Sequence, residues 1–239
     1  MLAHRRNADA LLCGGCGYPL DAVRREPACP ECGRPIAESL PAYRIGSPWQ
    51  RSASLPAWFK TASMLTRWRT LFDRISIDAG KNRWLLRVNL GVASPLCAAA
   101  VLWQEAARAV QTGRGWGSVL GGGLLVVPMA YGFVWTLTRI EAFGLRFFGN
   151  RRGGRVSPAI ARAVVAHASY GWILAGLLAW AGAVASGNGL STWLGEVTGG
   201  WAPGPVPVRP VAIGLGFFGG LLLFETLSYL GILRCRFAN

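Results

Sequence analysis

Four long apolar stretches dominate the pattern of hydrophobic and polar positions along the chain. A helix needs about 20 mostly apolar residues to cross the hydrocarbon core of a bilayer, and three of the stretches reach that length unaided. The first stretch is shorter, but it reaches spanning length when it is extended upstream to Leu85. The pattern therefore predicts an all-α membrane protein in which residues 83–239 form a four-transmembrane-helix bundle. The predicted spans cover about residues 85–104, 118–138, 163–185 and 211–233.

The residues before the first span show a different pattern. Over residues 54–82, apolar side chains such as Trp58, Leu65 and Phe72 recur at steps of three and four, which places them on one face of a juxtamembrane amphipathic helix. Basic residues flank that face, so the helix suits either an anionic membrane surface or packing against the bundle. Residues 41–53 are rich in proline and serine, and they are predicted to form an extended linker.

The composition agrees with a membrane class. Hydrophobic residues make up 52% of the 239 residues, charged residues make up 15%, and the mean hydropathy is +0.33. Soluble domains carry about 25% charged residues, and a chain of this size cannot bury four such helices in a core of its own. The lipid bilayer is therefore the expected partner of the helices.

The distribution of the net charge of +14 orients the spans. Residues 1–87 carry a net charge of +7 and the connection 139–163 carries +5, whereas the connections 104–115 and 186–210 carry +1 and 0. Basic connections remain on the cytoplasmic side of a membrane. We therefore expect a multi-pass protein of the cytoplasmic (inner) membrane with both termini in the cytoplasm.

Four of the six cysteines form two CxxC pairs that are separated by twelve residues. The four are Cys13, Cys16, Cys29 and Cys32. Two intervening residues let both thiolates of a pair reach one ion, and zinc takes four tetrahedral ligands. Gly17 and Gly33 follow the pairs, where a tight turn requires a positive φ, and their amides are expected to donate to the sulfurs. In a reducing cytosol the pattern predicts structural Zn²⁺ rather than disulfides, in a zinc ribbon over residues 1–40 that needs the metal to fold.

The segments CGGCGYPL and CPECGRP resemble zinc ribbons and their rubredoxin-like knuckles. Rubredoxins hold iron for electron transfer, so a membrane-tethered electron carrier is an alternative; here, however, the segment between the knuckles is shorter and lacks the aromatic core residues. The rest of the chain, through the run RIEAFGLRFFGNRRGGRVSPAIARAVVAHASYGW, resembles uncharacterised bacterial multi-pass proteins that join such a ribbon to a Yip-type helical membrane domain. This resemblance implies no activity.

Four polar side chains fall within the predicted spans or at their ends. They are Glu225, His167, Arg139 and Glu141. The charge pattern places all four in the cytoplasmic half of the membrane, where a charged group is costly and is a candidate functional residue. One interpretation is a small transporter or channel in which Glu225 carries protons or cations with His167 as its partner. The other is a buried pair that holds helices together.

Small residues and tryptophans give further expectations. The steps Gly117–Gly121 and Gly216–Gly220 predict close helix packing within the bundle. Cys97 is expected to be a small apolar residue, and the sequence assigns no role to Cys235. Tryptophans near the expected span ends are predicted to be interfacial anchors. These are Trp84, Trp103, Trp116, Trp172, Trp193 and Trp201.

The sequence favours a binding role over catalysis. It contains no phosphate loop, no HExxH and no GxSxG, so we expect no enzyme. Acidic residues balance the arginines of the ribbon, which argues against nucleic acid as a partner. The leading hypothesis is a membrane adaptor whose ribbon recruits a protein partner, and the sequence leaves the oligomeric state open.

Overall fold

The computed structural model of the chain describes residues 10–23, 26–77, 79–187 and 208–238. Its regular structure is helical, and the described residues form isolated β-bridges but no strand. The chain forms two compact units. Unit 1 comprises residues 1–85, 141–167 and 227–239. Unit 2 comprises residues 86–140 and 168–226.

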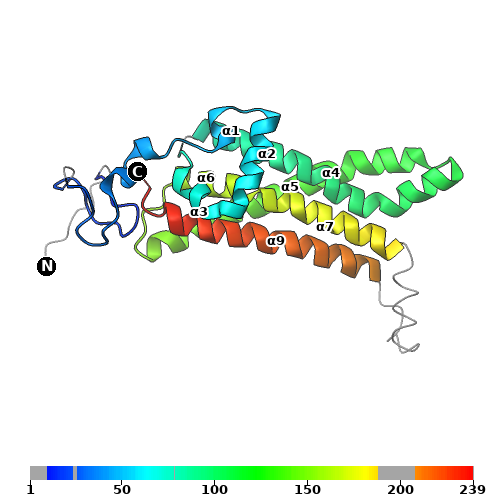
Figure 1. Cartoon of the computed structure of the whole chain (residues 1–239). Coiled ribbons are helices and arrows are strands. Elements are labelled where there is room, and N and C mark those ends of the chain that lie inside the picture. Colours follow the sequence, from blue (N-terminus) through cyan, green and yellow to red (C-terminus); the bar gives the residue numbers. More distant parts are fainter. Residues whose placement is uncertain (1–9, 24–25, 78, 188–207, 239) are drawn as a thin grey trace. The chain divides into compact units, whose positions relative to one another are not determined.

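Unit 2 contains most residues of four long apolar helices, three of which extend into unit 1; the helices are shown in Figure 1. They are α4 (Ala79–Thr112), α5 (Trp116–Arg151), α7 (Tyr170–Gly187) and α9 (Val208–Cys235). Four helical segments are long and apolar enough to cross a membrane, and the third of them joins α6 (Pro158–Ala168) to α7. These helices and the N-terminal cluster of four cysteines confirm the predicted fold class.

Helix α7 packs against both α4 and α9 at glycines. A Cβ atom placed on Gly176 would lie 2.7 Å from the Cβ of Leu96 in α4. A Cβ atom placed on Gly171 would lie 2.6 Å from the backbone nitrogen of Phe224 in α9. Since real Cβ atoms essentially never approach so closely, only glycine allows these three helices to meet.

The two predicted small-residue steps have different surroundings. Gly216 and Gly220 lie against the backbone of α7, so the prediction of close packing is confirmed for them. Around Gly117 and Gly121 in α5, by contrast, no described atom lies within 4 Å of an added Cβ. The prediction is therefore wrong for this second step, because its face of α5 points away from the other described helices.

Trp172 lies in the interior of unit 2 and is fully buried. Its indole N–H donates to the hydroxyl of Thr138 at 2.9 Å, and its ring centroid is 4.6 Å from that of Phe224. The prediction of an interfacial anchor is wrong here, because a threonine hydroxyl replaces the water that an indole N–H otherwise seeks. Trp193 and Trp201 lie outside the described residues.

Unit 1 contains short helices before the first span. These are η1 (Ile36–Ser39), η2 (Pro41–Tyr43), α1 (Pro48–Arg51), α2 (Leu55–Ser63), η3 (Met64–Arg67) and α3 (Trp68–Arg74). The segment predicted as an extended linker thus contains a helix, α1, which begins with a capping box between Ser47 and Gln50. The predicted amphipathic helix is divided by η3, where the Ser63 and Thr66 hydroxyls donate to backbone carbonyls and so compete with regular helix.

Candidate metal centre

The two cysteine pairs fold into equivalent turns with the shared sequence Cys-x-x-Cys-Gly-x-Pro. The Gly17 N–H donates to the Cys13 carbonyl at 2.9 Å, and the Gly33 N–H donates to the Cys29 carbonyl at 2.9 Å. Both glycines have a positive φ, +80° and +70°, as the sequence predicts. Their amides therefore bond to carbonyl oxygens, and the prediction that they donate to the sulfurs is wrong.

The chain folds back on itself after each turn. The Cys13 N–H donates to the Tyr18 carbonyl at 2.8 Å, and the Cys29 N–H donates to the Arg34 carbonyl at 2.8 Å. Tyr18 and Arg34 thus occupy equivalent positions in the two halves of the ribbon. Tyr18 packs on the apolar core of the ribbon, whereas the Arg34 side chain reaches towards other parts of unit 1.

The four sulfur atoms are arranged to hold one ion. All four lie within 4.8 Å of one another, and the cross-pair distances are 3.5 Å for Cys13–Cys32 and 3.7 Å for Cys16–Cys29. Tetrahedral coordination at a zinc–sulfur distance of about 2.3 Å places sulfurs about 3.8 Å apart. The geometry therefore fits a single four-thiolate metal ion.

The thiols influence one another's pKa values. Burial acts to raise the pKa of Cys13, but the backbone N–H groups of Cys16 and Gly15 and the Cys32 and Cys29 thiols together outweigh burial and lower this pKa to about 6. Burial and the neighbouring thiols raise the pKa of Cys16 to about 12. The backbone N–H of Arg34 acts to lower the pKa of Cys32, but burial and the Cys13 and Cys29 thiols together outweigh it, so this pKa is also raised. One thiolate therefore forms readily and hinders the next, and a divalent cation would relieve that repulsion.

The ribbon has a very small apolar core. Leu11, Leu20 and Ile36 are buried together with the Cys13 and Cys29 side chains, and Tyr18 and Val23 pack against them in part. Segments of this size rarely bury enough apolar surface to fold alone. A bound metal ion would supply the missing stability.

Side chains outside the ligand set attach the ribbon to the rest of unit 1. The Arg155 guanidinium donates to the Ala10 carbonyl at 2.8 Å. The Phe237 ring lies so close to Gly17 that an added Cβ would be 2.6 Å from it. Arg34 approaches Asp73 of α3 with an N···O distance of 3.8 Å. Both halves of the ribbon therefore contact other parts of unit 1.

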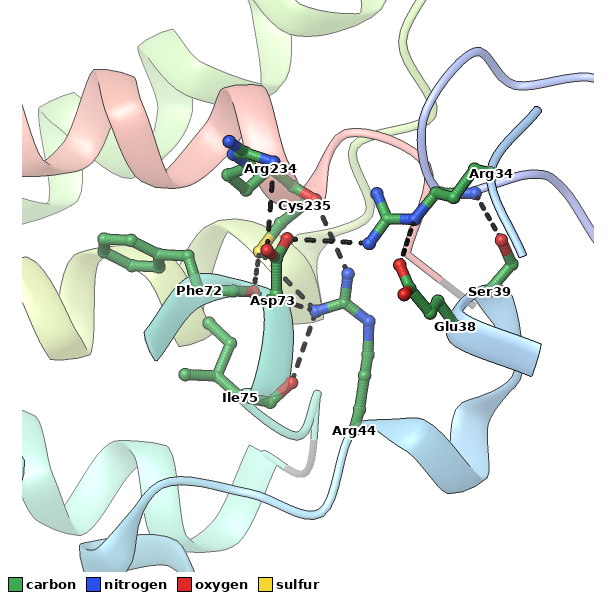
Figure 2. Close-up of polar contacts among 10 residues, drawn as sticks. Arg34, Glu38, Ser39, Arg44, Phe72, Asp73, Ile75, Arg234 and Cys235 are labelled. Atoms are coloured by element: carbon green, nitrogen blue, oxygen red, sulfur yellow. Dashed lines mark hydrogen bonds and ion pairs between the residues drawn. The ribbon is translucent and has the colours of Figure 1, made fainter. Parts of the chain in front are cut away.

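Arg44 joins two helix ends next to the ribbon, as Figure 2 shows. Its guanidinium donates to the Phe72 and Ile75 carbonyls at the end of α3, at 3.1 and 3.4 Å, and approaches the Arg234 carbonyl in the last turn of α9 at 3.5 Å. Carbonyls at the end of a helix lack partners within that helix. One planar guanidinium thus serves the C-terminal ends of both helices and complements their dipoles.

Cys235 and Asp73 complete this network. The buried Cys235 thiol donates to the Phe72 carbonyl at 3.3 Å, which gives this cysteine a structural position that the sequence does not indicate. Asp73 lies between Arg34 and Arg234, at N···O distances of 3.8 Å to each (Figure 2). Arg34 also forms a shorter ion pair with Glu38, at 3.1 Å. Arg34, which belongs to the turn that contains Cys29 and Cys32, is thereby linked through the Asp73 carboxylate to Arg234 near the end of α9.

Two of the predicted intramembrane residues belong to unit 2. Arg139 directly follows Thr138 and Glu225 directly follows Phe224, so both lie at the level of Trp172 in the bundle. Both side chains are exposed. Arg139 lies over the Trp135 ring at 5.5 Å, and Glu225 makes no hydrogen bond or ion pair within the part of the chain that is described.

The other two residues, His167 and Glu141, belong to unit 1. His167 is fully buried, and its Nδ1 bonds the Ala163 carbonyl at 2.8 Å while its Nε2 bonds the Ser47 hydroxyl at 3.0 Å. Because both ring nitrogens are engaged, the structure gives His167 a partner in α6 and one before α1. Glu141 is half-buried.

Sequence reasoning missed Arg34, Arg44 and Asp73. A signal for Arg34 exists, because the repeated Cys-x-x-Cys-Gly-x-Pro pattern places it opposite Tyr18. No local pattern marks Arg44 or Asp73, since their partners are distant in the sequence.

Comparison with models of known protein families, with curated proteins and with solved structures gives no match. Of the resemblances drawn from the sequence, the structure supports the four long apolar helices and the four-cysteine cluster.

Proposed function

We propose that this protein spans the cytoplasmic (inner) membrane and holds a zinc ribbon on the cytoplasmic side as an adaptor for a protein partner. The attachment of the ribbon carries this proposal. Contacts at Arg155, Gly17 and Arg34 fix the ribbon to unit 1 without using a metal ligand. Cys16 and Cys32 lie on its exposed side, so a fixed surface next to the metal remains available for a partner.

Zinc is the metal that we propose for this site. Four cysteine sulfurs at tetrahedral spacing match a structural zinc site, in which thiolates fill every coordination position. No position then remains for a substrate or a water molecule, which favours a structural and binding role over an enzymatic one. Metal analysis distinguishes zinc from the iron of a rubredoxin-like electron carrier, which would colour the protein.

The orientation is supported by the composition of unit 1. Its three segments, 1–85, 141–167 and 227–239, largely coincide with the stretches that the charge pattern assigns to the cytoplasmic side. Unit 1 contains 20 of the 25 basic and 8 of the 11 acidic residues of the sequence, a net charge of +12. Such an excess of arginine is typical of the cytoplasmic side of membrane proteins.

Cysteine accessibility in intact cells tests the orientation. Arg114 and Arg152 are both exposed, and they lie in connections on opposite sides of the proposed membrane. We expect an impermeant thiol reagent to modify Arg114→Cys, and to modify Arg152→Cys only after the cells are opened. The reverse pattern would place the ribbon outside the cytoplasm.

Cross-linking in native membranes tests the adaptor role. We expect full-length protein to capture a defined partner, and Cys16→Ser to lose it together with the metal. Cys97→Ser is the matched control, because Cys97 lies in α4 of unit 2 and outside the ligand set. Capture that is unchanged in Cys16→Ser, once metal loss has been measured, would contradict the adaptor role of the ribbon.

A further inference from the structure

A shallow pocket of about 430 Å³ lies on the last turns of α5, within unit 1. Its lining residues are Phe143, Arg146, Phe147, Asn150 and Arg151. Helical spacing places the two phenylalanines and Asn150 in the middle of one face, with an arginine at either edge. The pocket thus combines two cations with an aromatic floor.

The side chains of the pocket are ordered by stacking. The Phe143 and Phe147 ring centroids are 6.1 Å apart with an interplanar angle of 17°, and the Arg151 guanidinium lies 4.4 Å from the Phe147 centroid. Arg146 and Arg151 are exposed, and neither forms an ion pair with a described carboxylate. Stacking leaves the N–H groups of Arg151 free to bind an acceptor.

The one neutral polar group of the pocket is already engaged. Asn150 Oδ1 accepts from the Val156 N–H at 2.7 Å, and Asn150 Nδ2 donates to the Val156 carbonyl at 3.2 Å. These bonds fix the turn that follows α5, and they leave the two guanidinium groups as the polar groups available to a ligand. The chemistry of the pocket therefore selects an anion.

The surroundings of the pocket are apolar. Only 6% of the most apolar stretch of α5 is buried, against 22–50% in the other three candidate spans. Phe143 is 66% exposed at the edge of this surface. A ligand that fits both parts has an anionic head for the arginines and a long apolar body for the helix surface.

We propose that this pocket binds the phosphate headgroup of an anionic phospholipid. Each guanidinium donates to phosphate oxygens, while the acyl chains continue along the exposed apolar surface of α5. Free phosphate would bind the guanidinium groups but would have no acyl chains to contact the helix surface. The proposal does not depend on what the ribbon binds.

The arginines near this span end have a second explanation, because positive charge on the cytoplasmic side orients a span in the membrane. That effect depends on how many charges are present and not on where each arginine lies on the helix. Arg152 separates the two explanations. It is exposed and directly follows Arg151, yet it does not line the pocket. Replacement of Arg152 removes one positive charge from the same region of the chain, as replacement of Arg151 alone does.

Native mass spectrometry of the full chain in neutral detergent tests the proposal, with added phosphatidylglycerol or phosphatidylcholine. We expect wild type to prefer phosphatidylglycerol. The single variant Arg151→Gln should lower that preference by about fivefold, and Arg146→Gln/Arg151→Gln should lower it by about tenfold or more. Arg152→Gln should leave the preference unchanged, and helical circular dichroism should show that all variants remain folded.

Three results would overturn the proposal. Equal retention of the two lipids by wild type would show that the headgroup is not recognised. A loss in Arg152→Gln equal to the loss in Arg151→Gln would show that only the total charge matters. Displacement of the lipid by millimolar inorganic phosphate would show that the pocket is a site for a free anion.

Discussion

Units 1 and 2 of this protein are stabilised in different ways. Unit 1 carries a net charge of +12, whereas unit 2 has five basic and three acidic residues. In unit 1, polar side chains such as Arg44 and Gln50 bond backbone groups of distant segments. In unit 2, glycines such as Gly171 and Gly176 bring helix backbones into contact.

The difference is consistent with the proposal that unit 2 lies in lipid and most of unit 1 lies in water. Between helices in lipid there is no hydrophobic driving force, so association depends on close packing and on a few internal hydrogen bonds. A unit in water must instead compensate every buried polar group. Gln50 illustrates this, because its buried amide bonds the backbone N–H groups of Ser47 and Ser76, the Ser76 carbonyl and the Asn82 side chain. The stability of unit 1 should therefore depend on its polar groups and on the metal. The stability of unit 2 should depend on the size of the side chains where its helices meet.

The largest expected effect is loss of the metal. Purified wild type should contain about one zinc ion per chain, and Cys16→Ser or Cys32→Ser should release it and unfold the ribbon, since structural zinc supplies about 10 kcal/mol or more of folding free energy. The helices of unit 2 should stay folded. Elemental analysis and limited proteolysis measure both outcomes. Cys97→Ser is the control, and full zinc retention in both ligand variants would show that the assigned ligands are wrong.

A larger side chain at a helix contact should destabilise unit 2 and leave unit 1 unchanged. Gly220→Val introduces a side chain against the backbone of Ala175, and we expect the free energy of unfolding to fall by about 3 kcal/mol. Gly121→Val is the matched control in α5, because no described atom lies within 4 Å of its added Cβ. Thermal unfolding of both variants in detergent makes the comparison. Equal destabilisation would mean that the two glycine steps do not differ as the structure indicates.

Removal of the Arg44 side chain should loosen unit 1. Arg44→Met removes the Arg44 donor from the Ile75 and Arg234 carbonyls and leaves the Phe72 carbonyl with the Cys235 thiol alone, so we expect a loss of about 2 kcal/mol in the free energy of unfolding. Hydrogen exchange at the ends of these two helices measures the effect. The control Arg51→Met removes an exposed arginine at the end of α1 and should change exchange little. Unchanged protection in Arg44→Met would show that other groups hold the helix ends.

The smallest effect is expected at Glu225. Because it has no polar partner among the described residues, Glu225→Gln should change the free energy of unfolding by less than about 0.5 kcal/mol. Chemical unfolding in detergent measures this change. A proton or cation flux in proteoliposomes that disappears in Glu225→Gln would instead favour the transporter hypothesis.

Much of the architecture could be predicted from the sequence because its signals are local. The length of an apolar stretch determines whether one helix can cross a bilayer, and this needs no knowledge of its neighbours. The spacing of Cys13 and Cys16, and of Cys29 and Cys32, likewise places two sulfurs on one turn. The turns require a positive φ after each pair, and the structure confirms a positive φ at Gly17 and Gly33.

Only the tertiary structure decided which face of each helix meets another. Gly117–Gly121 and Gly216–Gly220 have the same spacing in sequence, yet among the described helices only the second pair touches a neighbour. Trp172 resembles an interfacial anchor until Thr138 of α5 satisfies its N–H within the bundle. The contacts of Arg44 join residues almost 200 positions apart. Such pairings depend on how helices rotate and pack against one another, and periodicity along a single chain does not encode that rotation.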